Sequence, residues 1–254
     1  SFAKENDRRI NVAIVPNSFE ILKEKVPRGL PLVDEKKEID KFYKDLEAFE
    51  NVKTVDLYPK LLETSGEGKQ VYYRTDHHWT TAAAYEGYKV ICREMGIAPS
   101  SFETVKKGSI RDFYGTYYAK YKGIFIKADT IEYYDIPVDS YLINEKDSFD
   151  SLYDEDKAKI YDKYAFFLRG NYGLAVIKGK GQKRGRDLIV IKDSYGNCLI
   201  PFLTMDYDSI TVLDLRYYGG SVKKLLDEKK DQDILLLYNF AHLNEDNNFY
   251  KLIK

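Results

Sequence analysis

The sequence Thr75-Asp76-His77-His78-Trp79-Thr80-Thr81 lies between an aromatic run, residues 71–73, and an alanine-rich segment, residues 82–95. The aromatic run predicts a short strand. The apolar spacing in 82–95 predicts a helix that Thr80 or Thr81 can cap. A carboxylate and two imidazoles therefore fall at a strand-to-helix junction. Such groups can supply the base and the orienting acid of a catalytic triad, whose nucleophile must come from elsewhere in the chain.

The best nucleophile candidate is Ser194, which follows the apolar run of residues 187–191. This run predicts a buried parallel strand, and active residues of open α/β sheets gather at the carboxyl ends of strands. A serine hydroxyl is a weak nucleophile without a base. We therefore expect Asp76 to orient His78, and His78 to act as the base for Ser194. From position alone, a serine that merely caps a helix is a competing interpretation.

Strand and helix patterns alternate along the chain on both sides of these motifs. Apolar runs predict strands, and amphipathic or capped segments predict helices. The expected strands are 11–15, 52–57, 71–73, 187–191, 209–215 and 233–239, and the expected helices are 34–50, 82–95, 197–204 and 221–228. This alternation predicts an α/β fold in which helices cover both faces of a mainly parallel central sheet.

Residues 100–186 have a different sequence pattern from the rest of the chain, because aromatic and turn residues alternate there. We expect strands, hairpins and loops, with one short charged helix near 151–163. The segment is expected to be a Tyr-rich β/loop insertion inside a single domain of residues 1–254. The 23 tyrosines of the chain suit either glycan and peptide surfaces or β-rich packing.

Composition excludes some classes of protein. Lys plus Arg number 40 and Asp plus Glu 41, so the net charge of −1 gives no general reason to expect nucleic-acid binding. Cys92 and Cys198 lack the spacing of a zinc site, and a disulfide between them is left open. The histidines lack dense ligand spacing, so we expect no metal. No apolar run approaches the ~18–20 residues that span a bilayer. We expect an N-terminal leader or anchor segment that precedes residue 1 and is not part of this sequence.

Two further segments carry candidate binding residues. Asn171, beside Gly170, is a candidate oxyanion donor through its side-chain amide, and an ordinary turn is the alternative. Arg216 can bind an anionic substrate group or an acyl carbonyl, and a surface salt bridge is the alternative.

The tetrad Asp76-His77-His78-Trp79 resembles the signature of the DHHW proteins of bacteria. These are similar to the alginate O-acetyltransferase group of the SGNH-hydrolase superfamily. Lys192-Asp193-Ser194-Tyr195 resembles the serine motif of that group, and residues 214–218 resemble its downstream arginine segment. The resemblance implies an SGNH-like three-layer α/β/α fold. With these motifs, the candidates for oxyanion or substrate binding are Asn171, Gly170, Arg216, Tyr195, His77 and Trp79. The role of His77 stays open.

The resemblance also implies an activity. Ser194 would take an acetyl group as an ester and pass it to a sugar hydroxyl or to water, with no metal or dissociable cofactor. The expected protein is an exported or cell-surface polysaccharide O-acetyltransferase or O-acetylesterase, working beside a membrane-bound O-acyltransferase. The first alternative is an accessory protein that binds polysaccharide without turnover. A cytosolic esterase or lipase is the second.

Overall fold

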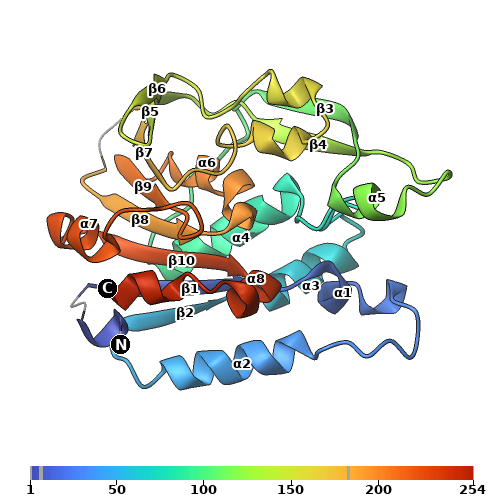
Figure 1. Cartoon of the computed structure of the whole chain (residues 1–254), viewed down its shortest axis with the longest axis horizontal. Helices are drawn as coiled ribbons and strands as arrows, with labels where there is room; N and C mark the ends of the chain where they lie inside the picture. Colours follow the sequence, from blue (N-terminus) through green and yellow to red (C-terminus); the bar gives the residue numbers. More distant parts are fainter. Residues whose placement is uncertain (1, 6–7, 182–183, 254) are drawn as a thin grey trace.

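The centre of the molecule is a parallel sheet with an antiparallel extension (Figure 1). The computed structural model describes residues 2–5, 8–181 and 184–253. Within these residues one sheet has the strand order β2 (Val52–Asp56), β1 (Ile10–Val15), β10 (Asp233–Asn239), β8 (Asp187–Lys192), β9 (Ser209–Leu213), β7 (Leu174–Gly179), β5 (Val138–Ile143) and β6 (Asp147–Phe149). The strands from β2 to β9 run parallel, and β7, β5 and β6 continue the sheet antiparallel. The predicted mainly parallel sheet is confirmed.

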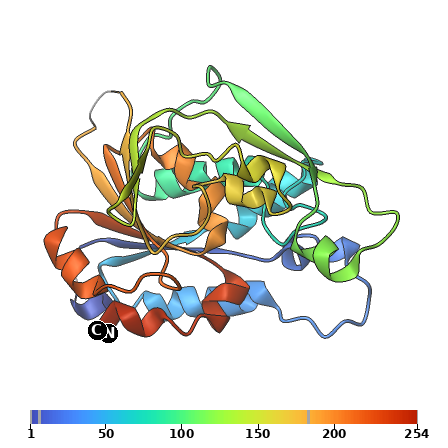
Figure 2. The ribbon, with the colours of Figure 1, turned by 45° about the horizontal axis from the view of Figure 1, so that its top comes forward.

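Two layers of helices cover this sheet, because successive side chains of a strand point to opposite faces (Figure 2). In β1, Ile10 and Val12 belong to one core cluster, and Ala13 and Val15 belong to the other. The first face contacts α2 (Glu35–Leu46), α7 (Val222–Glu228) and the 3-10 helix η6 (Phe249–Ile253). The second face contacts α3 (Tyr58–Gly66), α4 (Thr81–Glu94) and α6 (Ile200–Leu203). The predicted three-layer α/β/α fold is therefore confirmed.

The remaining described elements are short and lie mostly at the ends of the strands. They are α1 (Ser18–Ile21), α5 (Thr116–Tyr121), α8 (Phe240–Glu245), β3 (Lys107–Phe113), β4 (Asp129–Tyr134) and the 3-10 helices η1 (Phe2–Glu5), η2 (Lys23–Lys25), η3 (Lys157–Lys159), η4 (Lys163–Phe166) and η5 (Ser194–Cys198). Strands β3 and β4 pair with each other in a separate antiparallel sheet.

The helix after the histidine stretch forms as its sequence predicts. The Thr80 hydroxyl accepts a hydrogen bond from the Ala83 amide at 3.2 Å, which caps the first turn of α4. Gly96 follows the last turn with φ +75°, a conformation that glycine adopts without strain. Local capping signals therefore fix both ends of α4.

The strand predicted at 71–73 is wrong. Tyr73 N donates to His78 O, and Thr80 N donates to Val71 O. Tyr72 and Trp79 make an isolated bridge. The segment thus turns back on its own continuation and forms a tight loop, and its backbone groups are satisfied without joining a sheet.

Several expectations for the middle of the chain need correction. The helix expected near 151–163 is wrong, because that segment forms only the 3-10 helices η3 and η4 and loops. Strands β5, β6 and β7 join the main sheet, so the segment 100–186 extends the sheet as well as covering it. The helix expected at 197–204 begins as the 3-10 helix η5. Helices α3 and α8 were not predicted.

Both cysteines are buried and free, so the disulfide that the sequence left open does not form. Among the described residues, no helix has the length and apolar character needed to cross a membrane.

Candidate active site

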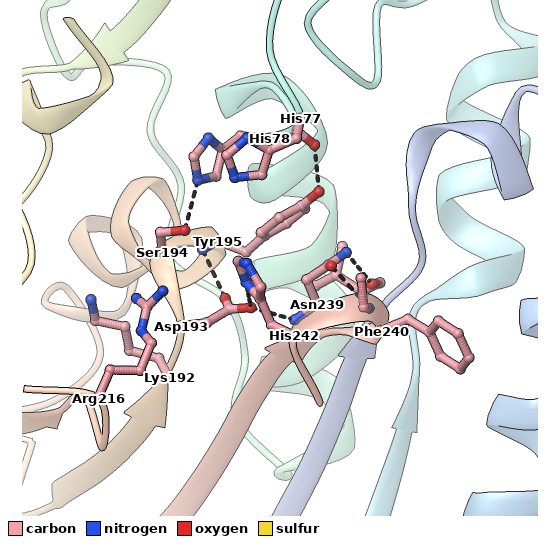
Figure 3. Close-up of polar contacts among 12 residues, drawn as sticks. His77, His78, Lys192, Asp193, Ser194, Tyr195, Arg216, Asn239, Phe240 and His242 are labelled. Carbon is pink, nitrogen blue, oxygen red and sulfur yellow. Dashed lines mark hydrogen bonds and ion pairs between the residues drawn. The ribbon is translucent and has the colours of Figure 1, made fainter. Parts of the chain in front are cut away.

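The carboxyl end of β8 presents Ser194 at the start of the 3-10 helix η5 (Figure 3). Asp193 caps this helix, because its Oδ1 accepts a hydrogen bond from Tyr195 N at 2.8 Å. The Ser194 side chain is largely buried, with 7% of the residue exposed. The first N–H groups of a helix have no partner within the helix. The hydroxyl of Ser194 therefore lies beside an N–H that can donate outward.

His78 connects Ser194 to Asp76. The Nε2 atom of His78 lies 2.8 Å from Ser194 Oγ, although the two residues are 116 positions apart in the chain. The Nδ1 atom of the same ring lies 2.5 Å from Asp76 Oδ1. With Asp76 as acceptor, Nδ1 carries the proton and Nε2 is the acceptor for the serine hydroxyl. These three side chains form a continuous hydrogen-bond chain.

The Asp76 carboxylate is held from two sides. Its Oδ1 also accepts from His78 N at 3.0 Å, and its Oδ2 accepts from Thr116 N at 2.8 Å and Thr116 Oγ1 at 3.1 Å. Gly115 makes this approach possible, because a Cβ there would lie 2.2 Å from Asp76 Cβ and Oδ2. Burial alone would raise the pKa of Asp76, but the hydrogen bond from His78 and the electrostatic interaction with that ring keep it well below its ordinary value. The carboxylate is therefore ionised at neutral pH.

The His78 ring is fixed in its plane by two neighbouring rings. Tyr164 stacks on it with ring centroids 3.7 Å apart and an interplanar angle of 10°. The His77 ring lies against it at 3.8 Å. Such contacts limit rotation of the imidazole, so its Nε2 stays directed at Ser194.

These residues open onto a cleft of about 450 Å³. Its lining includes all three members of the hydrogen-bond chain, and it adds tyrosine rings and polar side chains. These additional lining residues include His77, Tyr114, Thr116, Tyr161, Tyr164, Asn171, Asn197, Arg216 and His242. A larger, mainly apolar groove of about 580 Å³ lies between α2 and α8 and is lined by none of the candidate site residues.

A buried lysine fixes the orientation of the Asn171 amide. The Nζ atom of Lys192 donates to Asn171 Oδ1 at 3.1 Å and to Asn197 Oδ1 at 2.7 Å. Asn197 Nδ2 also donates to Asn171 Oδ1, at 3.1 Å. A lysine ammonium has only donors, so each amide must turn its oxygen toward it. These contacts use the oxygen of Asn171, so the NH₂ group of this cleft-lining residue remains available as a donor.

Arg216 reaches the cleft as part of an ion pair. Its Nε and Nη2 atoms donate to the two carboxylate oxygens of Asp214 at 2.9 and 2.7 Å. Lys192 Nζ lies 3.4 Å from the same carboxylate, and burial lowers the pKa of Lys192. Arg216 thus forms the salt bridge that was the alternative, and it also borders the cleft, where binding of a substrate group stays a prediction.

Three residues expected to bind substrate do not line the cleft. Trp79 and Tyr195 are both 0% exposed, and the indole N–H of Trp79 donates to Tyr195 O at 2.9 Å behind the site. Gly170 N is already used, because it donates to Phe167 O at 3.1 Å. We therefore correct these three assignments. Trp79 and Tyr195 hold the loop of 71–80 against η5, and Gly170 shapes a turn.

His77 lines the cleft, but it takes no part in the hydrogen-bond chain to Ser194. Its Nδ1 lies 2.7 Å from Thr116 Oγ1. Burial, with the nearby His78, lowers the pKa of His77 to about 4, so its ring is neutral at neutral pH. Ligand atoms of Asp76, His77 and His78 lie within 4.8 Å of one another, as in a small metal site. However, both nitrogens of His78 already have partners, Asp76 and Ser194, which fits a proton relay better than a metal ligand set.

His242 is a cleft residue that the sequence reasoning missed. Its Nδ1 lies 2.8 Å from Asp193 Oδ2, which also accepts from Asn239 N at 2.8 Å (Figure 3). The hydrogen bond to Asp193 raises the pKa of His242. The sequence signal was available: this third histidine follows the last predicted strand by a few residues, at the same edge of the sheet as Ser194.

Comparison with known proteins gives one family and several similar folds. A family model described as DHHW protein matches residues 7–213. No curated protein matches the sequence. A DHHW family protein from Eubacterium siraeum has 24% identity and a TM-score of 0.81, over 98% of this chain and 82% of that chain.

Two further solved structures share the fold. PatB1 of Bacillus cereus has 20% identity and a TM-score of 0.76, over 95% of this chain and 86% of that chain. The O-acetyltransferase domain of Pseudomonas putida AlgJ has 14% identity and a TM-score of 0.61, over 98% of this chain and 81% of that chain. At these identities the likeness establishes the fold.

Proposed function

The chain belongs to the DHHW family, and from this premise we propose that it is an acyl-transfer enzyme with Ser194 as nucleophile. The observation that carries the proposal is the hydrogen-bond chain Asp76–His78–Ser194, with distances of 2.5 and 2.8 Å, at the wall of an open cleft. A nucleophile, a base and an orienting carboxylate in this order are the groups that acyl transfer needs.

In the first half-reaction, Ser194 Oγ attacks the carbonyl carbon of an acetyl donor while His78 Nε2 takes the hydroxyl proton. The carbonyl oxygen becomes an oxyanion, which the Asn171 NH₂ group and the Ser194 N–H stabilise. When the intermediate collapses, the bond to the leaving group breaks, and the leaving group takes the proton from His78. Acetyl-Ser194 remains.

In the second half-reaction, His78 takes a proton from an acceptor hydroxyl, and the resulting oxygen attacks the acetyl carbon. Collapse of the second oxyanion breaks the ester bond to Ser194, whose Oγ recovers the proton from His78. A sugar hydroxyl as acceptor gives O-acetyl transfer, whereas water gives hydrolysis. Asp76 stays ionised and stabilises the charged imidazole in both steps.

We propose a cell-surface or exported polysaccharide as the substrate. Tyr114 and Tyr161 line the cleft, and Tyr161 is 58% exposed, so aromatic faces are available for sugar rings. The fold of the AlgJ O-acetyltransferase domain supports O-acetyl transfer. We further propose that the enzyme acts outside the cytoplasm. A membrane-bound O-acyltransferase would supply the acetyl group.

The decisive experiment is covalent labelling of Ser194. PatB1 of Bacillus cereus has been solved with a sulfonyl adduct, and sulfonyl fluorides and fluorophosphonates react with activated serines. We expect one label on the wild-type chain, located on Ser194 by peptide mass spectrometry, and none on Ser194→Ala. Ser148→Ala, at an exposed serine, is the matched control and should label fully.

The labelled and unlabelled proteins are then assayed with an acetyl ester, with and without polysaccharide acceptors. Acetylated polysaccharide indicates a transferase, and acetate alone indicates an esterase. If Ser194 takes no label and no ester turns over, the proposal fails. Polysaccharide binding that survives Ser194→Ala in a protein without turnover would indicate the accessory, binding role instead.

A further inference from the structure

The segment 121–127, which begins at the last residue of α5, carries two apolar side chains that are almost fully exposed. Ile124 is 93% exposed and Phe125 94%, the highest values among the large apolar side chains of the described residues. Figures 1 and 2 both show this loop extending away from the body of the molecule beyond α5. We refer to residues 121–127 as the tip loop.

The geometry of the tip loop makes this exposure unusual. Ile126 N donates to Gly123 O at 3.4 Å, so Ile124 and Phe125 occupy the two central positions of a turn. Such positions favour Gly, Pro, Asn, Asp and Ser. Nothing in the turn itself requires an isoleucine and a phenylalanine, and neither contributes to the core. These side chains therefore suit a surface outside the molecule.

The tip loop and the adjoining Lys120 form a positively charged segment. Lys120, Lys122 and Lys127 are exposed, and none of the three forms an ion pair with a described residue. From position 113 to position 128 the sequence contains no Asp or Glu. The net charge of the whole chain is −1, so this cluster is a local feature. Tyr121, at 79% exposed, adds an aromatic ring with a polar tip.

We propose that the tip loop binds the surface of a membrane that contains anionic lipids. Ile124 and Phe125 enter the boundary between headgroups and acyl chains, and Lys120, Lys122 and Lys127 contact lipid phosphates. Tyrosine and lysine are the residues that accompany apolar anchors at a bilayer surface. A protein partner fits less well, because lysine is depleted in the centre of protein interfaces and the tip loop is convex.

The position of the tip loop ties this contact to the cleft. Helix α5 carries the tip loop at its carboxyl end, and its first and fourth residues, Thr116 and Ala119, line the cleft. Membrane contact would hold the cleft close to the lipid surface. Two apolar side chains with three lysines give reversible binding, weaker than that of a spanning helix. The inference does not depend on the chemistry of Ser194.

The test is co-sedimentation of the whole chain with vesicles. One set contains equal parts of phosphatidylglycerol and phosphatidylcholine, and the other contains phosphatidylcholine alone. We expect binding to the first set at low salt, weaker binding at high salt, and little binding to the second. The double variant Ile124→Ser/Phe125→Ser should have at least about tenfold lower affinity for these vesicles, because it lacks the two large apolar side chains that the wild type transfers from water into the bilayer. Lys120→Gln/Lys122→Gln/Lys127→Gln should lose most of the salt dependence.

The matched control is Tyr250→Ser/Ile253→Ser, which removes one aromatic and one aliphatic side chain, 49% and 54% exposed, near the C-terminus. This control should bind like the wild type, and all variants should keep the wild-type melting temperature. The proposal is overturned if the wild type ignores anionic vesicles, or if the tip-loop and control variants bind equally. It is also overturned if the tip-loop variant only abolishes self-association seen without lipid, since a second copy of the chain would then be the partner.

Discussion

Lys192 shows how one buried side chain determines what another can do. Lys192 is 1% exposed, and its ammonium group donates to the side-chain oxygens of Asn171 and Asn197. A buried charge is costly unless it is paired and hydrogen-bonded, and Asp214 supplies the pairing charge. What the site gains is a defined orientation of the Asn171 amide. Lys192 is thus a positioning residue.

We expect Lys192→Met to lower kcat by about tenfold or more and to change KM little. The Asn171 amide would lose its fixed orientation, and an oxyanion donor acts mainly in the transition state. The measurement is steady-state hydrolysis of an acetyl ester, alongside Asn171→Ala and the double variant. If both residues act through one oxyanion contact, the double variant should be no slower than Asn171→Ala. Additive losses would contradict the positioning role.

His77 predicts a pH dependence of stability. Its pKa is lowered from an ordinary value of 6.5 to about 4, so between these values the unfolded chain binds more protons than the folded chain. The free energy of unfolding should therefore fall as pH falls from 6.5 to 4, by at most about 3 kcal/mol from this group. His242 acts in the opposite direction: its pKa is raised, so its contribution is lost as pH rises through the folded value.

Urea unfolding at several pH values checks this prediction. The variant His77→Gln should show a shallower loss of stability between pH 6.5 and pH 4 than the wild type. His242→Gln serves as the control, because the raised pKa of His242 should affect the slope above pH 6.5 and in the opposite direction. An unchanged acid slope in His77→Gln would mean that His77 titrates normally in the folded chain.

At the level of elements, the amino end of α5 positions Asp76. Thr116, the first residue of α5, donates to the carboxylate through both its N–H and its hydroxyl. Gly115 stands directly before it and touches Asp76. Because φ at Gly115 is −93°, the need for glycine here is steric and not conformational. Helix α5 can therefore approach the Asp76 carboxylate only because Gly115 has no Cβ.

Gly115→Ala should displace Asp76 from His78. We expect at least a tenfold loss of acetyl-ester turnover, because the imidazole is no longer oriented, and destabilisation of about 1–3 kcal/mol from overpacking. Gly66→Ala is the control, because a Cβ there meets nothing within 4 Å. Wild-type turnover in Gly115→Ala would show that Asp76 can move without loss of function.

At the level of the whole molecule, the reactivity of the two cysteine thiols measures how often the core opens. Cys92 comes from α4 and Cys198 from η5, and both belong to the core cluster on the same face of the sheet. Burial raises the pKa of each thiol to about 12. A thiol reacts as its thiolate, so both are unreactive in the folded chain.

We expect thiol reagents to label neither cysteine rapidly under native conditions and to label both in denaturant. Because both lie in one core, their labelling rates should rise together with urea and follow global unfolding. Mass spectrometry of labelled Cys92→Ala and Cys198→Ala separates the two sites. Rapid native labelling of one site alone would reveal local opening at that element.

The sequence by itself determined the local features. The runs 11–15, 187–191 and 233–239 predicted β1, β8 and β10, because continuous apolar stretches match buried parallel strands. Thr80 and Gly96 predicted the ends of α4, because caps are satisfied by neighbouring backbone groups. The residues Asp76, His78 and Ser194 were named from motifs, and their catalytic role stays a prediction.

Only the tertiary structure decided what surrounds these residues. Thr116 and Gly115 against Asp76, Lys192 against Asn171, and His242 against Asp193 are contacts between segments far apart in the chain. The strand order that places β1 and β8 on either side of β10 brings such segments together, and no local pattern encodes that order. The aromatic run at 71–73 does not form a sheet strand, because its backbone pairs with residues 78–80 of its own loop. A long-range contact holds that loop in place, since the buried Trp79 donates to Tyr195 O.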